Sequence, residues 1–287
     1  KLGHFFASSG KWRTNIDDIK DKTYYLYGYV PHFGGISMSI TDRNGANANY
    51  SAGAKVTLSN VPAVMPSDLC VVIGAKAGTG KETVEGLRRG DFAYKGSASD
   101  EGNYVFLLFD HLYAALRIRM RVHDDYAALR TIKLKSLSLK TYAGETTSSQ
   151  KTDIMVDLKA TDVSNPDENP IQTITYTPSG SAITEPLEFW SSEGELLTHE
   201  FSTFVGHFMP DGITTLVLTS VYDVYDTQRN LIRKDCKATN TMVLSELLTD
   251  QATTLRGRRY TINMTIKPTY LYMLSEPDLN NPTVTVE

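Results

Sequence analysis

The chain has 287 residues, 41% of them hydrophobic and 22% charged, with a formal net charge of −4. At about 100–200 residues per domain, this length predicts two domains, each with its own core. The acidic balance gives no general attraction to nucleic acid or anionic lipid, and no apolar run reaches the ~18 residues of a membrane helix.

Apolar and polar residues alternate with a period of two along much of the chain, which predicts antiparallel strands with one wet face. In chain order, the predicted strands are 56–58, 69–73, 104–109, 116–122, 132–142, 153–160, 216–225 and 259–267. A change of phase after Lys135 predicts a β-bulge near Ser136.

Helical patterns are few. Short helices are predicted only at 83–89 and at 124–129, the second capped by Asp124 or Asp125. Many short strands with few helices are typical of all-β sandwiches or barrels.

A small, polar stretch without periodicity, AGETTSSQK at 143–151, is the best candidate for a domain boundary. It predicts an N-terminal domain at 1–147 and a C-terminal domain at 148–287. A second polar stretch at 164–170 is expected to be a loop within the second domain.

The segment GAKAGTGK at 74–81 is similar to a phosphate-binding loop. A true loop of that kind has four residues between its glycines and a hydroxyl residue after the lysine. Here five residues separate Gly74 from Gly80, and Glu82 stands in place of the hydroxyl. We therefore expect a flexible glycine-rich loop and no nucleotide or other cofactor.

No catalytic or metal site is predicted. The motifs of serine nucleophiles are absent, and the six histidines show no tight ligand spacing. Glu193 and Glu195 flank Gly194, which favours a solvated turn over an acid pair. The histidines are His4, His32, His111, His123, His199 and His207.

The two cysteines, Cys70 and Cys236, are far apart in the sequence. They are predicted to be two small buried side chains, with a disulfide between the halves as the alternative.

Basic residues alternate along two of the predicted strands and would form a solvated basic face if those strands were neighbours. An acidic partner protein or a glycan is the alternative use of such a face. These residues are Arg117, Arg119, Arg121, Lys133 and Lys135.

The C-terminal stretch 255–286 resembles the C-terminal end of fimbrillin-like pilus subunits and related surface lipoproteins of anaerobic Gram-negative bacteria. Members carry a G-x-x-Y-T-I-N strand there, matched by Gly257, Tyr260, Thr261, Ile262 and Asn263. The stretch 129–139, LRTIKLKSLSL, resembles the strand that closes the N-terminal domain of that family.

This resemblance implies two transthyretin-like or immunoglobulin-like antiparallel β-sandwich domains and a structural or adhesive role without catalysis. It implies an extracellular location on a fimbrium or the outer membrane. The expected partners are other fimbrial subunits or host surface ligands. Because the chain begins at Lys1 and not at Met, we expect a signal peptide or lipid-anchored segment to have been removed from a precursor.

The resemblance further implies assembly by strand donation, in which one subunit adds a strand to the sheet of the next. Cleavage after Arg13 is the candidate processing step. The alternating C-terminal tail is the candidate donor strand, formed by Pro282, Thr283, Val284, Thr285 and Val286.

A surface protein that binds or processes glycans is the alternative function, with Phe189 and Trp190 as candidate sugar-contacting aromatics. The position of the subunit as stalk, tip or anchor is left open by the sequence.

Overall fold

The computed structural model describes residues 4–6, 11–13, 22–45, 49–78, 86–95, 104–162, 164–165, 168–248, 252–267 and 278–286. For 4–6, 11–13 and 278–286 the description is limited to strand pairing.

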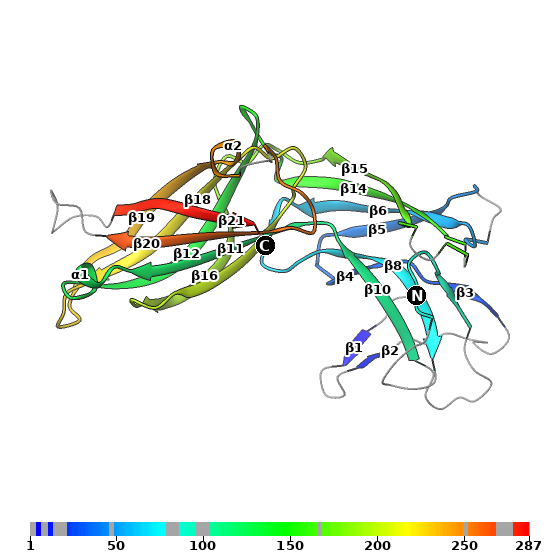
Figure 1. Ribbon diagram of the computed structural model, residues 1–287, viewed down its shortest axis with the longest axis horizontal. Coiled ribbons are helices and arrows are strands. Elements are labelled where there is room, and N and C mark those ends of the chain that lie inside the picture. The colour runs from blue at the N-terminus through cyan, green and yellow to red at the C-terminus, as the bar shows by residue number, and fades with distance from the viewer. Residues whose placement is uncertain are drawn as a thin grey trace.

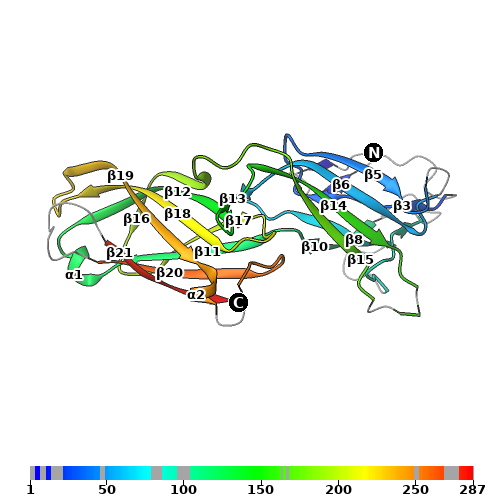
Figure 2. The same cartoon turned by 90° about the horizontal axis from the view of Figure 1, so that it is seen from above.

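Apolar side chains gather in two clusters, each between layers of β-sheet (Figures 1 and 2). The larger cluster lies between two sheets of long strands. One has the order β21-β20-β11-β17-β7, and the other β13-β12-β18-β19 with β16 also paired to β12. The strands of the first are β7 (Val64–Met65), β11 (Ala114–Val122), β17 (Ser202–Phe208), β20 (Arg259–Lys267) and β21 (Asp278–Val286). Those of the second are β12 (Thr131–Ala143), β13 (Thr146–Thr147), β16 (Leu187–Leu197), β18 (Thr215–Tyr225) and β19 (Leu231–Val243).

The smaller cluster lies between a sheet of order β15-β14-β6-β5 and a sheet of order β10-β8-β4. The first contains β5 (Ser37–Asp42), β6 (Gly53–Pro62), β14 (Lys151–Lys159) and β15 (Ile171–Pro178). The second contains β4 (Tyr29–Val30), β8 (Cys70–Gly78) and β10 (Tyr104–His111). Two further pairs join β1 (His4–Phe6) to β2 (Lys11–Arg13) and β3 (Tyr24–Tyr25) to β9 (Ala93–Tyr94).

The all-β antiparallel prediction is confirmed, with one exception among the described strands. β20 runs parallel to β11, with Ile262 opposite Ile118. The chain re-enters this sheet at the end where β11 begins, because Ala115 N–H donates to Arg258 O at 2.9 Å and Gly257 N–H donates to Tyr113 O at 2.8 Å. Two strands that start at the same end of a sheet must run parallel.

The bulge predicted near Ser136 is confirmed, since β12 shifts register between Leu134 and Ser136 against both of its long neighbours. Helix α1 (Asp124–Ala127) is confirmed but shorter than expected, and His123 caps it in place of an aspartate. Helix α2 (Leu244–Leu247) was not predicted. Of the helix predicted at 83–89, residues 83–85 lie outside the described residues, and 86–89 form no helix.

The boundary predicted at 147/148 does not separate the two clusters. Strands β11 and β12 precede it and contribute to the larger cluster, whereas β14 and β15 follow it and contribute to the smaller one. Part of the polar stretch expected to link domains is strand β13, which pairs with the end of β12. The division into two domains stays a prediction.

No described helix is long and apolar enough to cross a bilayer.

Replacing Gly53 with alanine should be strongly destabilising. Gly53 has φ +116°, and a Cβ there would stand 2.0 Å from the backbone oxygen of Leu158 in the neighbouring strand β14. At Gly35, φ is +100°, but no heavy atom lies within 4 Å of the position that a Cβ would take. We expect Gly35→Ala to cost about 1–3 kcal/mol through backbone strain alone, and Gly53→Ala to cost more than about 3 kcal/mol. Urea unfolding of both variants measures the difference, and equal midpoints would contradict it.

Candidate functional site

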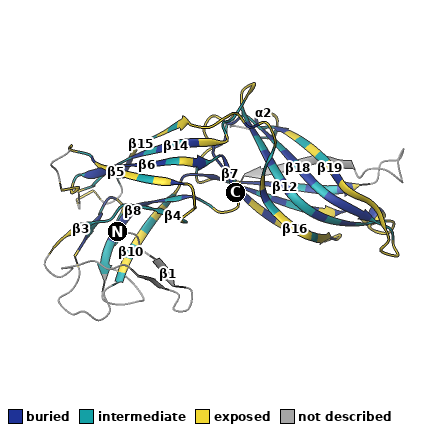
Figure 3. Ribbon diagram, turned by 180° about the vertical axis from the view of Figure 1, so that it is seen from behind, coloured by how far each residue is buried: buried dark blue, intermediate teal, exposed yellow. Residues whose placement is uncertain are grey.

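Strand β10 presents an exposed apolar surface at the edge of its sheet. Every second side chain of β10 is exposed, which Figure 3 shows as alternating bands. Val105, Leu107 and Phe109 are 37%, 38% and 39% exposed. We call these three residues the β10 apolar row. Among the described strands, β10 pairs only with β8, so its other edge is unpaired there. An exposed apolar edge strand is a template for adding another strand.

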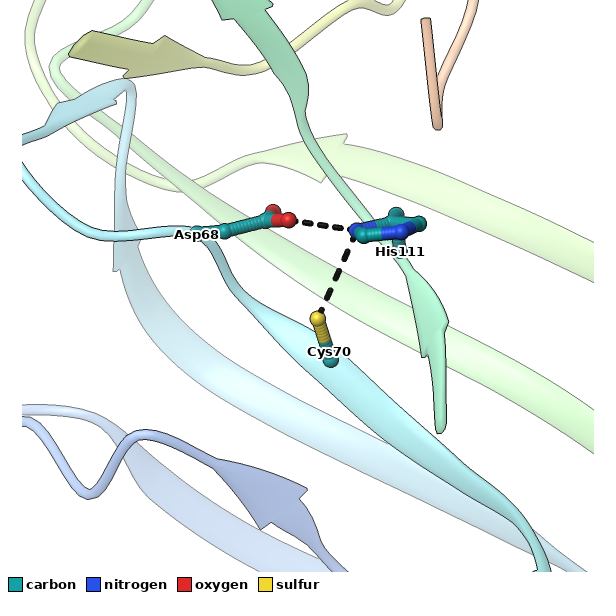
Figure 4. Close-up of side chains that lie close together, drawn as sticks. All are labelled: Asp68, Cys70 and His111. Carbon is teal, nitrogen blue, oxygen red and sulfur yellow. Dashed lines mark hydrogen bonds and ion pairs between the residues drawn. The ribbon is translucent and has the colours of Figure 1, made fainter. Parts of the chain in front are cut away.

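The exposed face of β10 ends at His111, where a polar cluster forms (Figure 4). We call Asp68, Cys70 and His111 the junction cluster. His111 is the direct cross-strand partner of Cys70. Asp68 precedes Cys70 by two positions and so points to the same side, whereas Leu69 between them is fully buried in the smaller cluster. Local β geometry therefore gathers the three side chains.

Both neighbours of His111 contact the same ring nitrogen. Asp68 Oδ2 is hydrogen-bonded to His111 Nδ1, and Cys70 Sγ lies 3.6 Å from that nitrogen. A catalytic triad needs the acid on one ring nitrogen and the nucleophile on the other. The junction cluster therefore lacks the geometry of a cysteine hydrolase.

The electrostatics agree with that conclusion. Burial, the charge of Asp68, a hydrogen bond to Asp68 and the charge of Asp110 together raise the pKa of the Cys70 thiol to about 12, with burial the largest cause. An activated cysteine has a lowered pKa instead. Cys70 is therefore a neutral thiol at physiological pH.

His207 of β17 lies close to the junction cluster. Burial lowers the pKa of His207, while the charge of Asp68 opposes this shift and that of His111 adds to it. Its Nδ1 lies 3.3 Å from the backbone oxygen of Pro66.

Arg256 fixes the end of β10 to the segment that leads into β20. Its guanidinium donates to the backbone oxygen of His111 at 2.9 Å and pairs with Asp110 at 3.0 Å. His111 thus sits on an anchored backbone although its side chain is 54% exposed.

The candidate donor residues Pro282–Val286 lie within β21, which pairs antiparallel with β20 of the same chain. Thr283 faces Asn263, and Val286 faces Tyr260. Arg13 lies at the end of β2, opposite His4 of β1. The donor and processing roles of these residues stay predictions.

The predicted basic face is wrong, because β11 and β12 belong to different sheets. The arginines of β11 and the lysines of β12 alternate with residues of the same larger cluster, so they lie on opposite outer faces of the layers. Arg119 and Arg121 stack on Phe201, at 4.5 and 4.8 Å from the ring centroid. Lys135 pairs with Asp235.

The candidate sugar-contacting aromatics belong to the larger cluster. Phe189 is 4% exposed, and Trp190 is half-buried with its ring 4.5 Å from that of Phe204. Glu193 and Glu195 lie within strand β16, so the turn predicted for them is wrong.

Cys236 is buried in the larger cluster, as predicted. Neither cysteine forms a disulfide, and Cys70, which was predicted to be buried, is only half-buried in the junction cluster. Gly74–Gly78 are the last residues of β8, so this part of the predicted loop is strand; Thr79, Gly80 and Lys81 lie outside the described residues.

Residues of the G-x-x-Y-T-I-N pattern help to hold β20 in its parallel pairing with β11. Gly257 adopts φ +67° in the turn before β20. The hydroxyl of Tyr260 accepts a hydrogen bond from Leu255 N–H at 2.8 Å, and Asn263 accepts one from its partner Arg119 at 3.4 Å.

The raised pKa of Cys70 predicts slow alkylation in the native protein. In a Cys236→Ala background, we expect the pH at which iodoacetamide alkylation reaches half its maximal rate to lie well above that of the urea-unfolded chain. Asp68→Asn should lower that pH, because it removes a negative charge that disfavours the thiolate. Asp125→Asn, far from the thiol in sequence and in another element, is the control. Equal pH dependence of alkylation in the native and the unfolded protein would contradict the raised pKa of Cys70.

No family model and no curated protein matches the sequence. Among solved structures, the chain is similar to a fimbrial protein from Bacteroides vulgatus, with 17% identity, 91% of this chain and 75% of that chain covered, and a TM-score of 0.35. It is also similar to a candidate cell adhesion protein from Bacteroides uniformis, with 10% identity, coverages of 85% and 78%, and a TM-score of 0.34. A third, from Parabacteroides distasonis, has 12% identity, coverages of 96% and 92%, and a TM-score of 0.31. The first is a fimbrial protein, and the other two are candidate cell adhesion proteins.

Proposed function

We propose that this protein is a structural or adhesive subunit of a cell-surface fimbria that joins its neighbour by strand addition. The observation that carries the proposal is the β10 apolar row on an edge strand. In strand addition, main-chain hydrogen bonds supply affinity and alternate side chains supply specificity. β10 offers both an edge and side chains at alternate positions.

The row suits a partner strand because its three apolar side chains share one face of β10. Full burial of a Leu or Phe side chain is worth about 1.5–3 kcal/mol. A strand carrying apolar residues at every second position would cover the row while its backbone pairs with the edge of β10 that meets no other described strand.

The C-terminal segment is the proposed donor. In this chain it completes the edge of its own sheet beside β20. Donation to a neighbour therefore requires its release from β20. Under this proposal, cleavage after Arg13 prepares the acceptor, and a lipid anchor on the precursor holds the subunit at the outer membrane.

Leu107→Lys should weaken assembly at least about tenfold, since it removes the apolar contact of Leu107 and also places a lysine charge where the added strand would cover it. Leu129→Lys is the matched control, because Leu129 is 39% exposed and lies outside β10. Sedimentation velocity over a concentration series, with the full chain and with the chain cleaved after Arg13, measures this effect. A chain that stays monomeric in both forms, or a Leu107→Lys variant that assembles normally, contradicts the proposal.

A disulfide across β20 and β21 should block donation reversibly. Asn263 and Thr283 are direct partners, so Asn263→Cys with Thr283→Cys would lock the donor in its own sheet. We expect assembly to stop when this pair is oxidised and to return on reduction. The control disulfide, Met155→Cys with Thr175→Cys, joins β14 to β15 and should leave assembly unchanged. Both are made in a background without the native cysteines. Assembly by the oxidised β20–β21 variant would exclude this segment as the donor.

A further inference from the structure

We propose that the junction cluster binds a divalent transition metal, with zinc the best fit, through an Asp68 carboxylate oxygen, Cys70 Sγ and His111 Nδ1. The three ligand atoms lie within 4.8 Å of one another. Carboxylate, thiolate and imidazole are the protein ligands that zinc takes, whereas calcium and magnesium prefer sites made of oxygen alone.

The separation of sulfur and nitrogen fits a tetrahedral site. Zinc bonds of about 2.3 Å to sulfur and 2.0–2.1 Å to nitrogen place these two ligands about 3.6 Å apart at a tetrahedral angle. The distance from Cys70 Sγ to His111 Nδ1 is 3.6 Å. Two of the three ligands are therefore already at the required spacing.

Asp68 would have to move slightly on binding. Its Oδ2 is now hydrogen-bonded to His111 Nδ1, and an ion would separate these atoms and bond to both. The other oxygen, Oδ1, is buried without a hydrogen-bond partner. A buried acceptor without a partner costs free energy, so a cation beside this carboxylate would offset an existing penalty.

The backbone does not need to rearrange. Cys70 and His111 are opposed on paired strands, and Arg256 holds the backbone oxygen of His111 at 2.9 Å. The exposed side chain of His111 leaves access from solvent, and three protein ligands leave the fourth position for water.

Binding must release a proton. Cysteine binds a metal as the thiolate, so the metal replaces the proton of the Cys70 thiol, which passes to the buffer. His111 must present the Nδ1 lone pair, so a neutral ring carries its hydrogen on Nε2 in the bound form. Affinity should therefore rise with pH. The charged or titratable groups that lie near members of the junction cluster include Asp110, Tyr113, His207 and Arg256.

Cobalt(II) is the probe that reports thiolate ligation directly. We expect the metal-free protein to take up one cobalt ion per chain, with a thiolate-to-cobalt charge-transfer absorption in the near ultraviolet, and zinc to displace it. Cys70→Ser should abolish that absorption, and both Cys70→Ser and His111→Ala should weaken zinc binding at least about 100-fold. Isothermal titration in two buffers of different ionisation enthalpy should show the released proton.

Cys236→Ser and His199→Ala are the matched controls, because neither residue belongs to the junction cluster, and both should bind as the unchanged protein does. Circular dichroism checks that each variant folds. Absence of saturable binding by the unchanged protein, or equal affinity in Cys70→Ser, overturns the proposal. If Cys70→Ser fails to fold, the charge-transfer band of Cys236→Ser decides the matter, since Cys70 is then the only thiol. None of these results depends on fimbrial assembly.

Discussion

The register of β8 against β10 is the constraint on which the junction cluster at the end of the apolar row depends. Between Leu108 and Phe109 the pairing shifts by one residue, so that Ile73 of β8 is an extra residue in the ladder. Without this shift His111 would face Val71, whose side chain is fully buried, and not Cys70. The bulge leaves the backbone oxygen of Ile73 without a partner on β10. This oxygen accepts a hydrogen bond from Gly90 N–H at 2.7 Å instead. One bulge therefore places the thiol beside the imidazole.

Gly74 shows how the same constraint explains a segment that first suggests phosphate binding. A Cβ on Gly74 would stand 2.3 Å from the backbone oxygen of Arg88. Glycine is needed here for the close approach of the segment that pairs with β8 after the bulge, where Ala75 N–H donates to Asp91 O at 2.6 Å. Gly74 therefore has a packing role in this segment.

Period-two alternation predicted most of the long strands and their buried faces, because a strand's own residues determine which side chains share a side. It could not predict partners. Arg117 and Lys133 have the same pattern, yet their strands lie in different sheets. The junction cluster was missed for the same reason: Cys70 and His111 are 41 positions apart, and only the bulge brings them together. The spacing of Asp68 and Cys70 by two was the one local signal available.

The junction cluster also lies where the chain passes between the two apolar clusters. Tyr113 belongs to the smaller cluster and Ala114 to the larger, and only two residues separate the end of β10 at His111 from the start of β11 at Ala114. Arg256 ties this crossing to the start of β20. Strand addition to β10 loses less conformational entropy when the acceptor strand is already ordered. Under the two proposals together, a metal bound at His111 would order the His111 end of β10 before a neighbouring subunit binds. The metal would then favour assembly without contacting the donor strand.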